Sequence, residues 1–255
     1  MSTTIINADV FKGLEMIQDE SINLMFIDPP YNLKKKYEDE VSDSWKSNDE
    51  YLNWLCKLLE LSLKKITKDG SLYIMNTTQN MPYIDIFLRD KINIKSRIVW
   101  AYDSSGVQAK KYFGSLYEPI LFCTNHKVKY TFNSKDILIP TKTGKKRQLI
   151  DYRKNPPKKY NDFKVPGNVW DFSRVRYKME EYVRHPSQKP EALLERIVKV
   201  SSNENDTILD LFAGTFSMGR VAQNLNRRYI GIELSEVYCN VGKERLNNAE
   251  YIVGD

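Results

Sequence analysis

The chain has 255 residues, of which 41% are hydrophobic and 28% charged, and its formal net charge is +6. This composition is typical of a globular protein and excludes a wholly disordered chain, and the length suits one large domain or one core with a sizeable insertion. No run approaches the roughly 18 consecutive apolar residues of a membrane-spanning helix, and residues 1–10 lack the features of a secretory signal, so we expect a cytoplasmic protein.

The first block of the chain alternates short apolar runs with amphipathic segments. Apolar runs that end at turn or proline signals predict buried strands, which we place at 4–7, 22–27, 71–76 and 95–102. Apolar residues spaced three or four apart predict helices at 10–17, 49–67 and 84–90. Gly70 lies just past the helix at 49–67, in a position typical of a helix end.

The middle block, residues 103–181, holds scattered aromatic residues, basic pairs and turn signals with little helical periodicity. We expect it to be irregular or short-stranded. Residues 104–184 contain 18 Lys and Arg against 7 Asp and Glu, whereas the rest of the chain contains 21 against 26. A basic block between slightly acidic ends favours a polyanion-binding surface, and the alternative is a solvated basic face.

The last block returns to alternation, with helices expected at 190–201, 218–226 and 235–247 and strands at 207–211 and 228–233. Strands that alternate with helices predict an α/β fold, with a mostly parallel sheet covered by helices on both faces. Cys56, Cys123 and Cys239 are far apart and only two histidines are present. We therefore exclude a disulfide scaffold and a zinc site, and expect reduced thiols.

A glycine turn, Asp-Leu-Phe-Ala-Gly-Thr at 210–215, follows the strand predicted at 207–211. The carboxyl ends of parallel strands form the ligand edge of such a sheet, and Gly214 lets the backbone approach a ligand closely. The segment lacks the GxxxxGK[ST] and GxGxxG patterns, which disfavours ATPase-type and dinucleotide sites. Glu233 ends the next strand, where its carboxylate can bind both ribose hydroxyls of an adenosine ligand. The alternative is an ordinary turn beside an exposed glutamate.

Asp28, Pro29, Pro30 and Tyr31 directly follow the buried run at 22–27. The two prolines fix two φ angles and remove two backbone donors, which leaves a rigid edge with a carboxylate, carbonyl acceptors and an aromatic ring. Asp28 and the Pro29 carbonyl can each accept one N–H of a planar NH2 group while Tyr31 stacks on the ring. Two such acceptors stabilise the charge that develops on an exocyclic amine during attack. The alternative is a simple strand-ending turn.

The sequence resembles the S-adenosylmethionine-dependent DNA amino-methyltransferases, in particular the adenine-N6 enzymes. The resemblance covers nearly the whole chain, and its motifs are NAD at 7–9, DPPY at 28–31, HPSQKP at 185–190 and FAGTF at 212–216. Segments such as KVPGNVWDF resemble stand-alone bacterial adenine methyltransferases. The motif order is that of the group called β, which implies a permuted Rossmann-like methyltransferase fold. The expected parts are a catalytic half at 1–103, a small basic target-recognition region at 104–184 and a cofactor-binding half at 185–255.

The resemblance implies a role for each motif residue. The catalytic residues, expected to hold and activate a flipped adenine of double-stranded DNA, are Asp28, Pro29, Pro30 and Tyr31. The residues expected to bind S-adenosylmethionine are Asp9, Asp28, Ser187, Lys189, Asp210, Phe212, Ala213, Gly214, Thr215 and Glu233. Lys189 is expected to pair with the methionine carboxylate of this cofactor. His185 is expected to shape its turn rather than act as a base.

The expected DNA contacts are basic residues of the middle block and of the segment after Tyr31, most of them directed to phosphate. They are Lys34, Lys35, Lys36, Arg147, Arg153, Lys154, Lys158, Lys159, Arg174 and Arg176. The resemblance favours a homodimer and implies neither a metal nor a covalent enzyme intermediate. It leaves open the recognised base sequence and a partner restriction nuclease.

Three other functions compete with adenine-N6 methylation. Cytosine-N4 enzymes use the same chemistry but more often carry Ser where this chain has Asp28. Methylation of RNA or of a protein glutamine is a second alternative, and the glutamine enzymes typically show Asn-Pro-Pro-Tyr after their cofactor motif, so Asp28 and the motif order argue against them. A catalytically inactive DNA-binding protein predicts degraded motifs, whereas the principal motifs here are intact.

Overall fold

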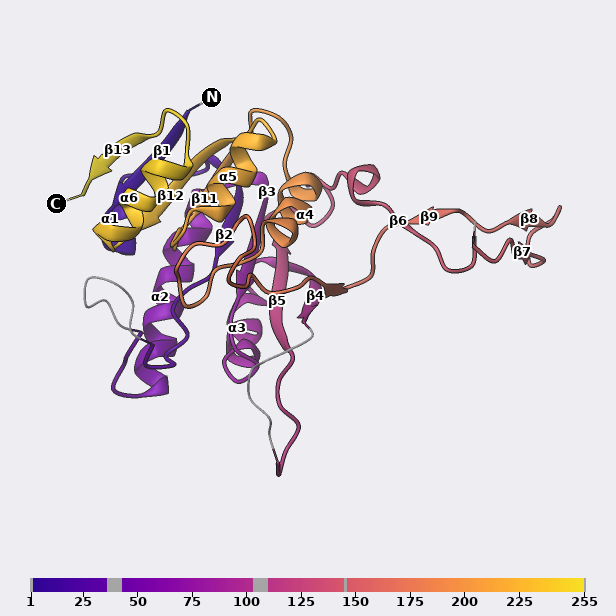
Figure 1. Ribbon diagram of the computed structural model, residues 1–255, viewed down its shortest axis with the longest axis horizontal. Coiled ribbons are helices and arrows are strands. Elements are labelled where there is room, and N and C mark those ends of the chain that lie inside the picture. Colours follow the sequence, from indigo (N-terminus) through magenta and orange to yellow (C-terminus); the bar gives the residue numbers. More distant parts are fainter. Residues whose placement is uncertain (1, 36–42, 103–109, 145, 255) are drawn as a thin grey trace.

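One large sheet forms the centre of the molecule in the computed structural model, which describes residues 2–35, 43–102, 110–144 and 146–254 (Figure 1). The strands of this sheet are β1 (Thr3–Asn7), β2 (Ile22–Ile27), β3 (Ile66–Met75), β4 (Asn93–Ala101), β5 (Tyr117–Thr124), β10 (Val169–Asp171), β11 (Thr207–Asp210), β12 (Arg228–Glu233) and β13 (Glu250–Val253). Their spatial order is β10-β4-β5-β3-β2-β11-β12-β1-β13. β5 runs antiparallel to β3 and β4, and the other neighbours pair in parallel, so the predicted mostly parallel sheet is confirmed.

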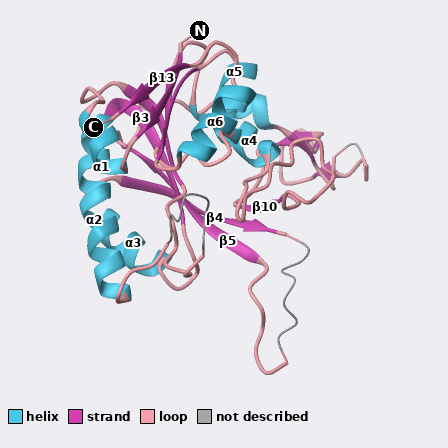
Figure 2. Ribbon diagram, turned by 60° about the vertical axis from the view of Figure 1, so that its left-hand side comes forward, coloured by secondary structure: helices cyan, strands magenta, loops and turns pink. Residues whose placement is uncertain are grey.

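Helices cover both faces of the sheet, as Figure 2 shows. One layer contains α1 (Val10–Glu15), α2 (Asn48–Lys65) and α3 (Met81–Leu88), and the other contains α4 (Glu191–Ser201), α5 (Ser217–Asn224) and α6 (Glu236–Arg245). Side chains of a strand alternate between the two faces, so a central strand must be apolar throughout. In β2, Met25 and Ile27 join the core under the first layer, whereas Leu24 and Phe26 join the core under the second. The α/β fold with two helical layers is therefore confirmed.

The boundary between α2 and β3 differs from the predicted one. The helix ends at Lys65, because Ile66 is already extended, with φ −80° and ψ 132°. Gly70 lies within β3 and does not end the helix. A Cβ at this position would lie 2.6 Å from the Ile66 side chain and 2.9 Å from the Ile22 carbonyl oxygen, so glycine is needed for the close approach of β2.

Three strands of the sheet were not predicted individually, and one of them is the short edge strand β10 in the middle block. β5 lies inside the block predicted to be irregular, and it occupies a central position between β3 and β4. That prediction is wrong for 117–124, because the apolar residues from Ile120 to Cys123 are fully buried in the sheet. β13 follows the last helix and pairs with β1 at the edge of the sheet.

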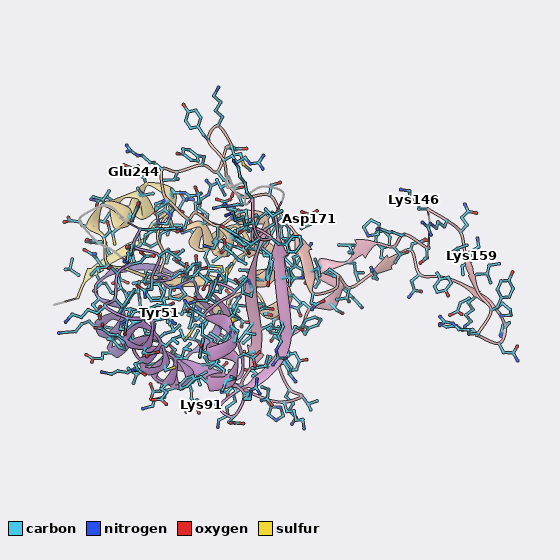
Figure 3. The ribbon with its side chains drawn as sticks, turned by 90° about the horizontal axis from the view of Figure 1, so that it is seen from below. Tyr51, Lys91, Lys146, Lys159, Asp171 and Glu244 are labelled. Carbon is cyan, nitrogen blue, oxygen red and sulfur yellow. The ribbon has the colours of Figure 1, made fainter. Side chains whose placement is uncertain are left out.

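An extended arm, which we define as residues 139–164, projects away from the core (Figures 1 and 3). It consists of two small antiparallel ladders, β6 (Ile139–Pro140) with β9 (Phe163–Lys164) and β7 (Ile150–Asp151) with β8 (Lys158–Lys159). Its sequence holds nine Lys or Arg residues and two Asp residues. The arm is thus the short-stranded, basic part of the middle block.

The helices of the described residues include none that is long and apolar enough to cross a membrane.

Candidate active site

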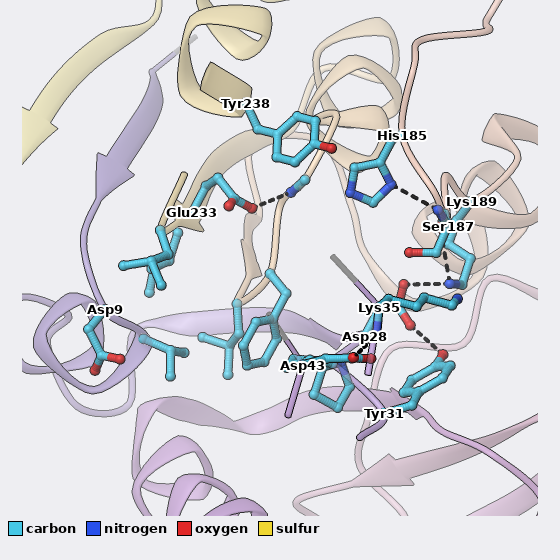
Figure 4. Close-up of a pocket in the computed structure, with 18 of the residues that line it drawn as sticks. Asp9, Asp28, Tyr31, Lys35, Asp43, His185, Ser187, Lys189, Glu233 and Tyr238 are labelled. Atoms are coloured by element: carbon cyan, nitrogen blue, oxygen red, sulfur yellow. Dashed lines mark hydrogen bonds and ion pairs between the residues drawn. The ribbon is translucent and has the colours of Figure 1, made fainter. Parts of the chain in front are cut away.

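A cavity of about 250 Å³ opens where β2, β11 and β12 end, which is the edge of the sheet at which ligands bind in α/β folds (Figure 4). Residues of all four predicted motifs line it together. From the predicted catalytic and cofactor-binding sets, the lining residues are Asp9, Asp28, Pro29, Pro30, Tyr31, Ser187, Lys189, Phe212, Gly214 and Glu233. The fold therefore brings together residues from Asp9 to Glu233, which lie far apart in the chain.

The carboxylate of Asp28 is held on both sides. The Tyr31 hydroxyl donates a hydrogen bond of 2.5 Å to Asp28 Oδ1, and Lys189 Nζ lies 2.7 Å from Asp28 Oδ2. Burial and the neighbouring Asp28 carboxylate raise the pKa of Tyr31 well above its usual value, so the phenol stays protonated and donates. Hydrogen bonds to both oxygens fix the orientation of the Asp28 carboxylate at the end of β2.

Lys189 is a buried cation, only 7% exposed, in the turn before α4. Its Nζ also lies 3.7 Å from Oε2 of Glu118, and it donates to the Ser187 carbonyl oxygen at 3.3 Å. A buried ammonium group requires such partners, because desolvation without compensation is costly. One lysine thus joins the segment before α4 to two carboxylates of the sheet edge.

His185 stabilises the same turn. Its Nδ1 accepts a hydrogen bond of 3.1 Å from the Ser187 backbone N–H, which requires an unprotonated Nδ1. Burial and the nearby Lys189 charge lower the pKa of His185 to about 4, so the ring is neutral near pH 7. This geometry agrees with the expected role of His185 in shaping the turn.

The glycine turn after β11 closes against Glu233. Gly214 has a φ of +50°, and its N–H donates to Glu233 Oε2 at 2.8 Å. The second oxygen of Glu233 accepts from the Ser235 N–H at 2.9 Å, at the start of α6. A Cβ on Gly214 would lie 3.2 Å from His185 Nε2. The turn therefore needs glycine both for its backbone conformation and for its contact with His185.

Three of the predicted cofactor residues lie outside the main cavity. Asp210, Ala213 and Thr215 line a smaller space of about 40 Å³, which shares Asp28 and Gly214 with the main cavity. Asp210 is buried, and it accepts from the Phe212 N–H at 3.3 Å and the Tyr229 hydroxyl at 3.4 Å. These contacts place Asp210 beneath the glycine turn rather than at the surface of the main cavity.

The segment after Tyr31 is pinned by Asp43, which the sequence analysis did not single out. Asp43 is 1% exposed and lines the cavity. Its carboxylate accepts from the backbone N–H groups of Leu33, at 3.2 Å, and of Lys35.

Lys35, expected to contact DNA, lines the cavity, and burial together with the Lys189 charge lowers its pKa. The predicted DNA contact Lys36 lies outside the described residues.

Most of the other predicted DNA contacts are exposed and lie away from the cavity. The arm carries Arg147, Arg153, Lys154, Lys158 and Lys159, and the segment between β10 and the turn before α4 carries Arg174 and Arg176. Arg153 Nε lies 2.8 Å from Asp151 Oδ1, and Arg174 lies over the Tyr102 ring at 5.1 Å from its centroid. Lys34 is exposed beside the cavity segment.

The described residues include no cluster of three or more His, Cys, Asp or Glu side chains that could hold a metal ion.

Comparison with known proteins places this site in a family. Residues 22–244 match the family described as DNA methylase. The chain is 53% identical over 248 residues to the DNA adenine methyltransferase YhdJ of Escherichia coli, covering 97% of this chain and 84% of the relative. It is 34% identical to the type II methyltransferase M.HpaI of Haemophilus parainfluenzae, covering 97% of this chain and 75% of that protein.

Solved structures agree with the fold. The structure of an M1.HpyAVI–SAM complex matches with a TM-score of 0.63 at 23% identity, covering 96% of this chain and 100% of that one. The PvuII DNA methyltransferase (cytosine-N4-specific) matches with a TM-score of 0.73 at 18% identity, covering 97% and 89%. These likenesses confirm the predicted methyltransferase fold. With the family match over most of the chain, they show that this chain belongs to the DNA methylase family and is a DNA methyltransferase.

Proposed function

We propose that this chain transfers the methyl group of S-adenosylmethionine to the N6 amine of an adenine flipped out of double-stranded DNA. The observation that carries this proposal is that Asp28, Pro29 and Tyr31 line the same cavity as Gly214 and Glu233. An amine-binding edge and an adenosine-binding turn that share one space can bring the two reacting groups together. The relative at 53% identity is named a DNA adenine methyltransferase, which supports adenine as the target base.

The residues of the cavity fit S-adenosylmethionine. The backbone at Gly214 is open because no Cβ fills the space next to His185, and Glu233 ends β12 beside it. We assign Glu233 to the ribose hydroxyls, Asp9 to the adenine amine of the cofactor, and Phe212 and Gly214 to the walls of its pocket. Ser187 and Lys189 are assigned to the methionine end. When bound, the cofactor supplies a methyl group on a positively charged sulfonium.

The Asp28 segment is assigned to the target base. The carboxylate of Asp28 and the carbonyl of Pro29 accept the two N–H bonds of the adenine amine, and Pro30 keeps this edge rigid. Acceptors on both hydrogens stabilise the positive charge that grows on the nitrogen during attack, and the N–H proton then leaves to water or to Asp28. The amine cannot reach this edge inside a duplex, so the nucleotide is extruded into the cavity beside Tyr31.

The basic middle block is assigned to DNA, with the arm as its projecting part. Exposed Lys and Arg side chains on a thin arm reach phosphates on both sides of a groove, and a few of them read base edges. The relative at 53% identity is named a DNA adenine methyltransferase, and the relative at 34% identity is named a type II methyltransferase. We assign a homodimer to the chain by family resemblance.

Two measurements test the proposal. Mass analysis of nucleosides, after incubation of plasmid DNA with the protein and S-adenosylmethionine, should show N6-methyladenine. N4-methylcytosine alone would instead establish the cytosine-specific alternative. A binding titration with S-adenosylmethionine separates both from an inactive DNA-binding protein, which would bind no cofactor.

Asp28→Ala should abolish transfer, with a loss of at least about 100-fold, because it removes the main acceptor for the amine. Binding of S-adenosylmethionine should persist, since Gly214 and Glu233 are untouched. The rate is measured by incorporation of labelled methyl groups and the affinity by calorimetry. Near-normal turnover in Asp28→Ala would overturn the assignment of the active site.

A further inference from the structure

Glu118 is a second carboxylate at the amine-binding edge. It lies at the start of β5, which runs antiparallel to its neighbours β3 and β4. The beginning of a reversed strand lies at the edge where parallel strands end, so Glu118 comes to the same edge as Asp28. Its side chain is 18% exposed and points toward Tyr31 and Lys189.

Glu118 shares both partners of Asp28. The Tyr31 hydroxyl that donates to Asp28 Oδ1 at 2.5 Å also lies 3.2 Å from Glu118 Oε2. The Lys189 ammonium lies 2.7 Å from Asp28 Oδ2 and 3.7 Å from Glu118 Oε2. In each case Asp28 has the shorter contact. One hydroxyl and one ammonium group thus lie between two carboxylates.

The proposed chemistry loosens the present contacts of Asp28. Each oxygen of its carboxylate already has one short contact, to the Tyr31 hydroxyl or to the Lys189 ammonium, and rotation of the carboxylate toward an incoming amine lengthens these contacts. Tyr31 is 9% exposed and Lys189 is 7% exposed, so water does not readily satisfy a donor that is released there. A buried donor without a partner is strongly unfavourable. An alternative acceptor within reach removes that penalty.

We propose that Glu118 is a positioning residue that takes over the Tyr31 hydroxyl when Asp28 turns to the adenine amine, while the Lys189 ammonium is held by the methionine carboxylate of the cofactor, to which it is assigned. This assignment rests on the proposed function and adds a residue to it. The negative charge of Glu118 lies beside Tyr31 and Lys189, which line the cavity, so it also favours the positive charge that grows on the amine during attack. The exchange needs only small rotations, because the Tyr31 hydroxyl already lies between the two acceptors.

A purely structural role predicts a different result. If Glu118 only stabilised the fold, its replacement would lower the melting temperature and all activities together. The positioning role predicts a selective loss in the chemical step, because binding of the cofactor and of DNA depends on other residues. A comparison of the turnover rate with the two KM values therefore separates the two roles.

The test compares Glu118→Gln with Glu60→Gln. Glu60 is an exposed glutamate on α2, paired with Lys91 at 3.2 Å, so the control removes the same charge far from the cavity. Methyl transfer is measured in single turnovers at saturating DNA and S-adenosylmethionine. Glu118→Gln should be at least tenfold slower with KM values within threefold of the wild type, and Glu60→Gln should match the wild type. A rate for Glu118→Gln within threefold of the wild type would overturn the proposal.

A double-variant cycle with Tyr31→Phe keeps the proposal testable if Glu118→Gln lowers stability. Rates are then expressed per folded molecule that binds S-adenosylmethionine. Because Glu118 acts through the Tyr31 hydroxyl, the double variant should be little slower than the slower single variant. Independent, multiplying losses would contradict the assignment. A wild-type protein that makes no N6-methyladenine overturns the proposed function itself, whereas an active wild type with an unaffected Glu118→Gln overturns only the role of Glu118.

Discussion

Asp210 is a buried carboxyl group beneath the glycine turn, and its hydrogen bonds from the Phe212 N–H and the Tyr229 hydroxyl are long, at 3.3 and 3.4 Å. Burial raises its pKa from 3.8 to about 7. Between about pH 4 and pH 7, the Asp210 carboxyl therefore keeps its proton in the folded protein but loses it in the unfolded chain. The folded state is favoured at low pH by this group, and that stabilisation is lost as the pH rises toward 7.

Asp210→Asn removes this titration and keeps an acceptor for the Phe212 N–H. Between pH 5 and pH 8 the free energy of unfolding of the wild type should fall relative to that of Asp210→Asn, by about 3 kcal/mol. Urea unfolding at several pH values measures the difference. Asp90→Asn, in an exposed turn, is the matched control. A difference that stays constant between pH 5 and pH 8 would show that Asp210 is already ionised.

Gly214 is the second residue with a specific physical requirement. Its positive φ and the 3.2 Å distance from its Cβ position to His185 Nε2 predict that Gly214→Ala distorts the turn. A left-handed conformation costs an alanine roughly 1–2 kcal/mol, so the affinity for S-adenosylmethionine should fall about tenfold. Calorimetry measures this loss. Gly167→Ala, where an added Cβ meets no atom within 4 Å, should bind as the wild type does.

At the scale of elements, the arm combines an excess of Lys and Arg with a position that projects away from the core, so it can contact a polyanion such as DNA. Lys158 and Lys159 form β8 and are both exposed. Replacing both by Gln should weaken DNA binding and reduce the slope of log affinity against log salt by about 2, because each phosphate contact releases about one counterion. Turnover at saturating DNA should not change. Fluorescence anisotropy at several salt concentrations measures the slope.

The control for this prediction is the pair Lys64→Gln and Lys68→Gln. These exposed lysines lie at the end of α2 and in the first part of β3, at the edge of the sheet opposite the cavity. They carry the same charge as β8 but lie away from the arm. An equal change of the salt slope in both pairs would mean that binding follows net charge and not the arm.

Elements with a strong local pattern were predicted from the sequence, and those defined by distant partners were not. β2 and β12 are short apolar runs and match their predicted bounds. β5 contains Pro119 and starts with polar residues, so its first half lacks a strand pattern. In the structure Pro119 lies one residue before the first pair with β3, where its missing N–H interrupts no bond to that strand. Only the sheet around it reveals β5 as a central strand.

The site follows the same division. The motif residues Asp28, Gly214 and Glu233 were identified from strand ends and turns, and they meet in one cavity. Glu118 was missed because its partner Tyr31 lies 87 residues away in the chain, and Asp43 was missed because no sequence pattern shows that the segment after Tyr31 folds back onto it. No local pattern marks an acidic residue as the partner of a distant lysine or tyrosine.

At the scale of the whole molecule, the sheet joins the two parts of the chain that flank the middle block. β2 pairs with β11 and β1 pairs with β12, so each part supplies neighbours to the other. A specific protease site inserted after Lys154 in the arm should therefore yield two fragments that stay together. After cleavage, gel filtration should show one peak that binds S-adenosylmethionine, with weakened DNA binding. Separation of the fragments would show that the arm holds the sheet together.

The position of β1 has a consequence for synthesis on the ribosome. β1 is made first, yet both of its neighbours in the sheet, β12 and β13, are made last. At 5–20 residues per second, Ile5 and Ile6 wait about 10 to 45 s before their partners in β12, Gly231 and Ile232, are made. A messenger RNA that is translated only as far as the glycine turn yields a chain in which β1 lacks both of its neighbours in the sheet.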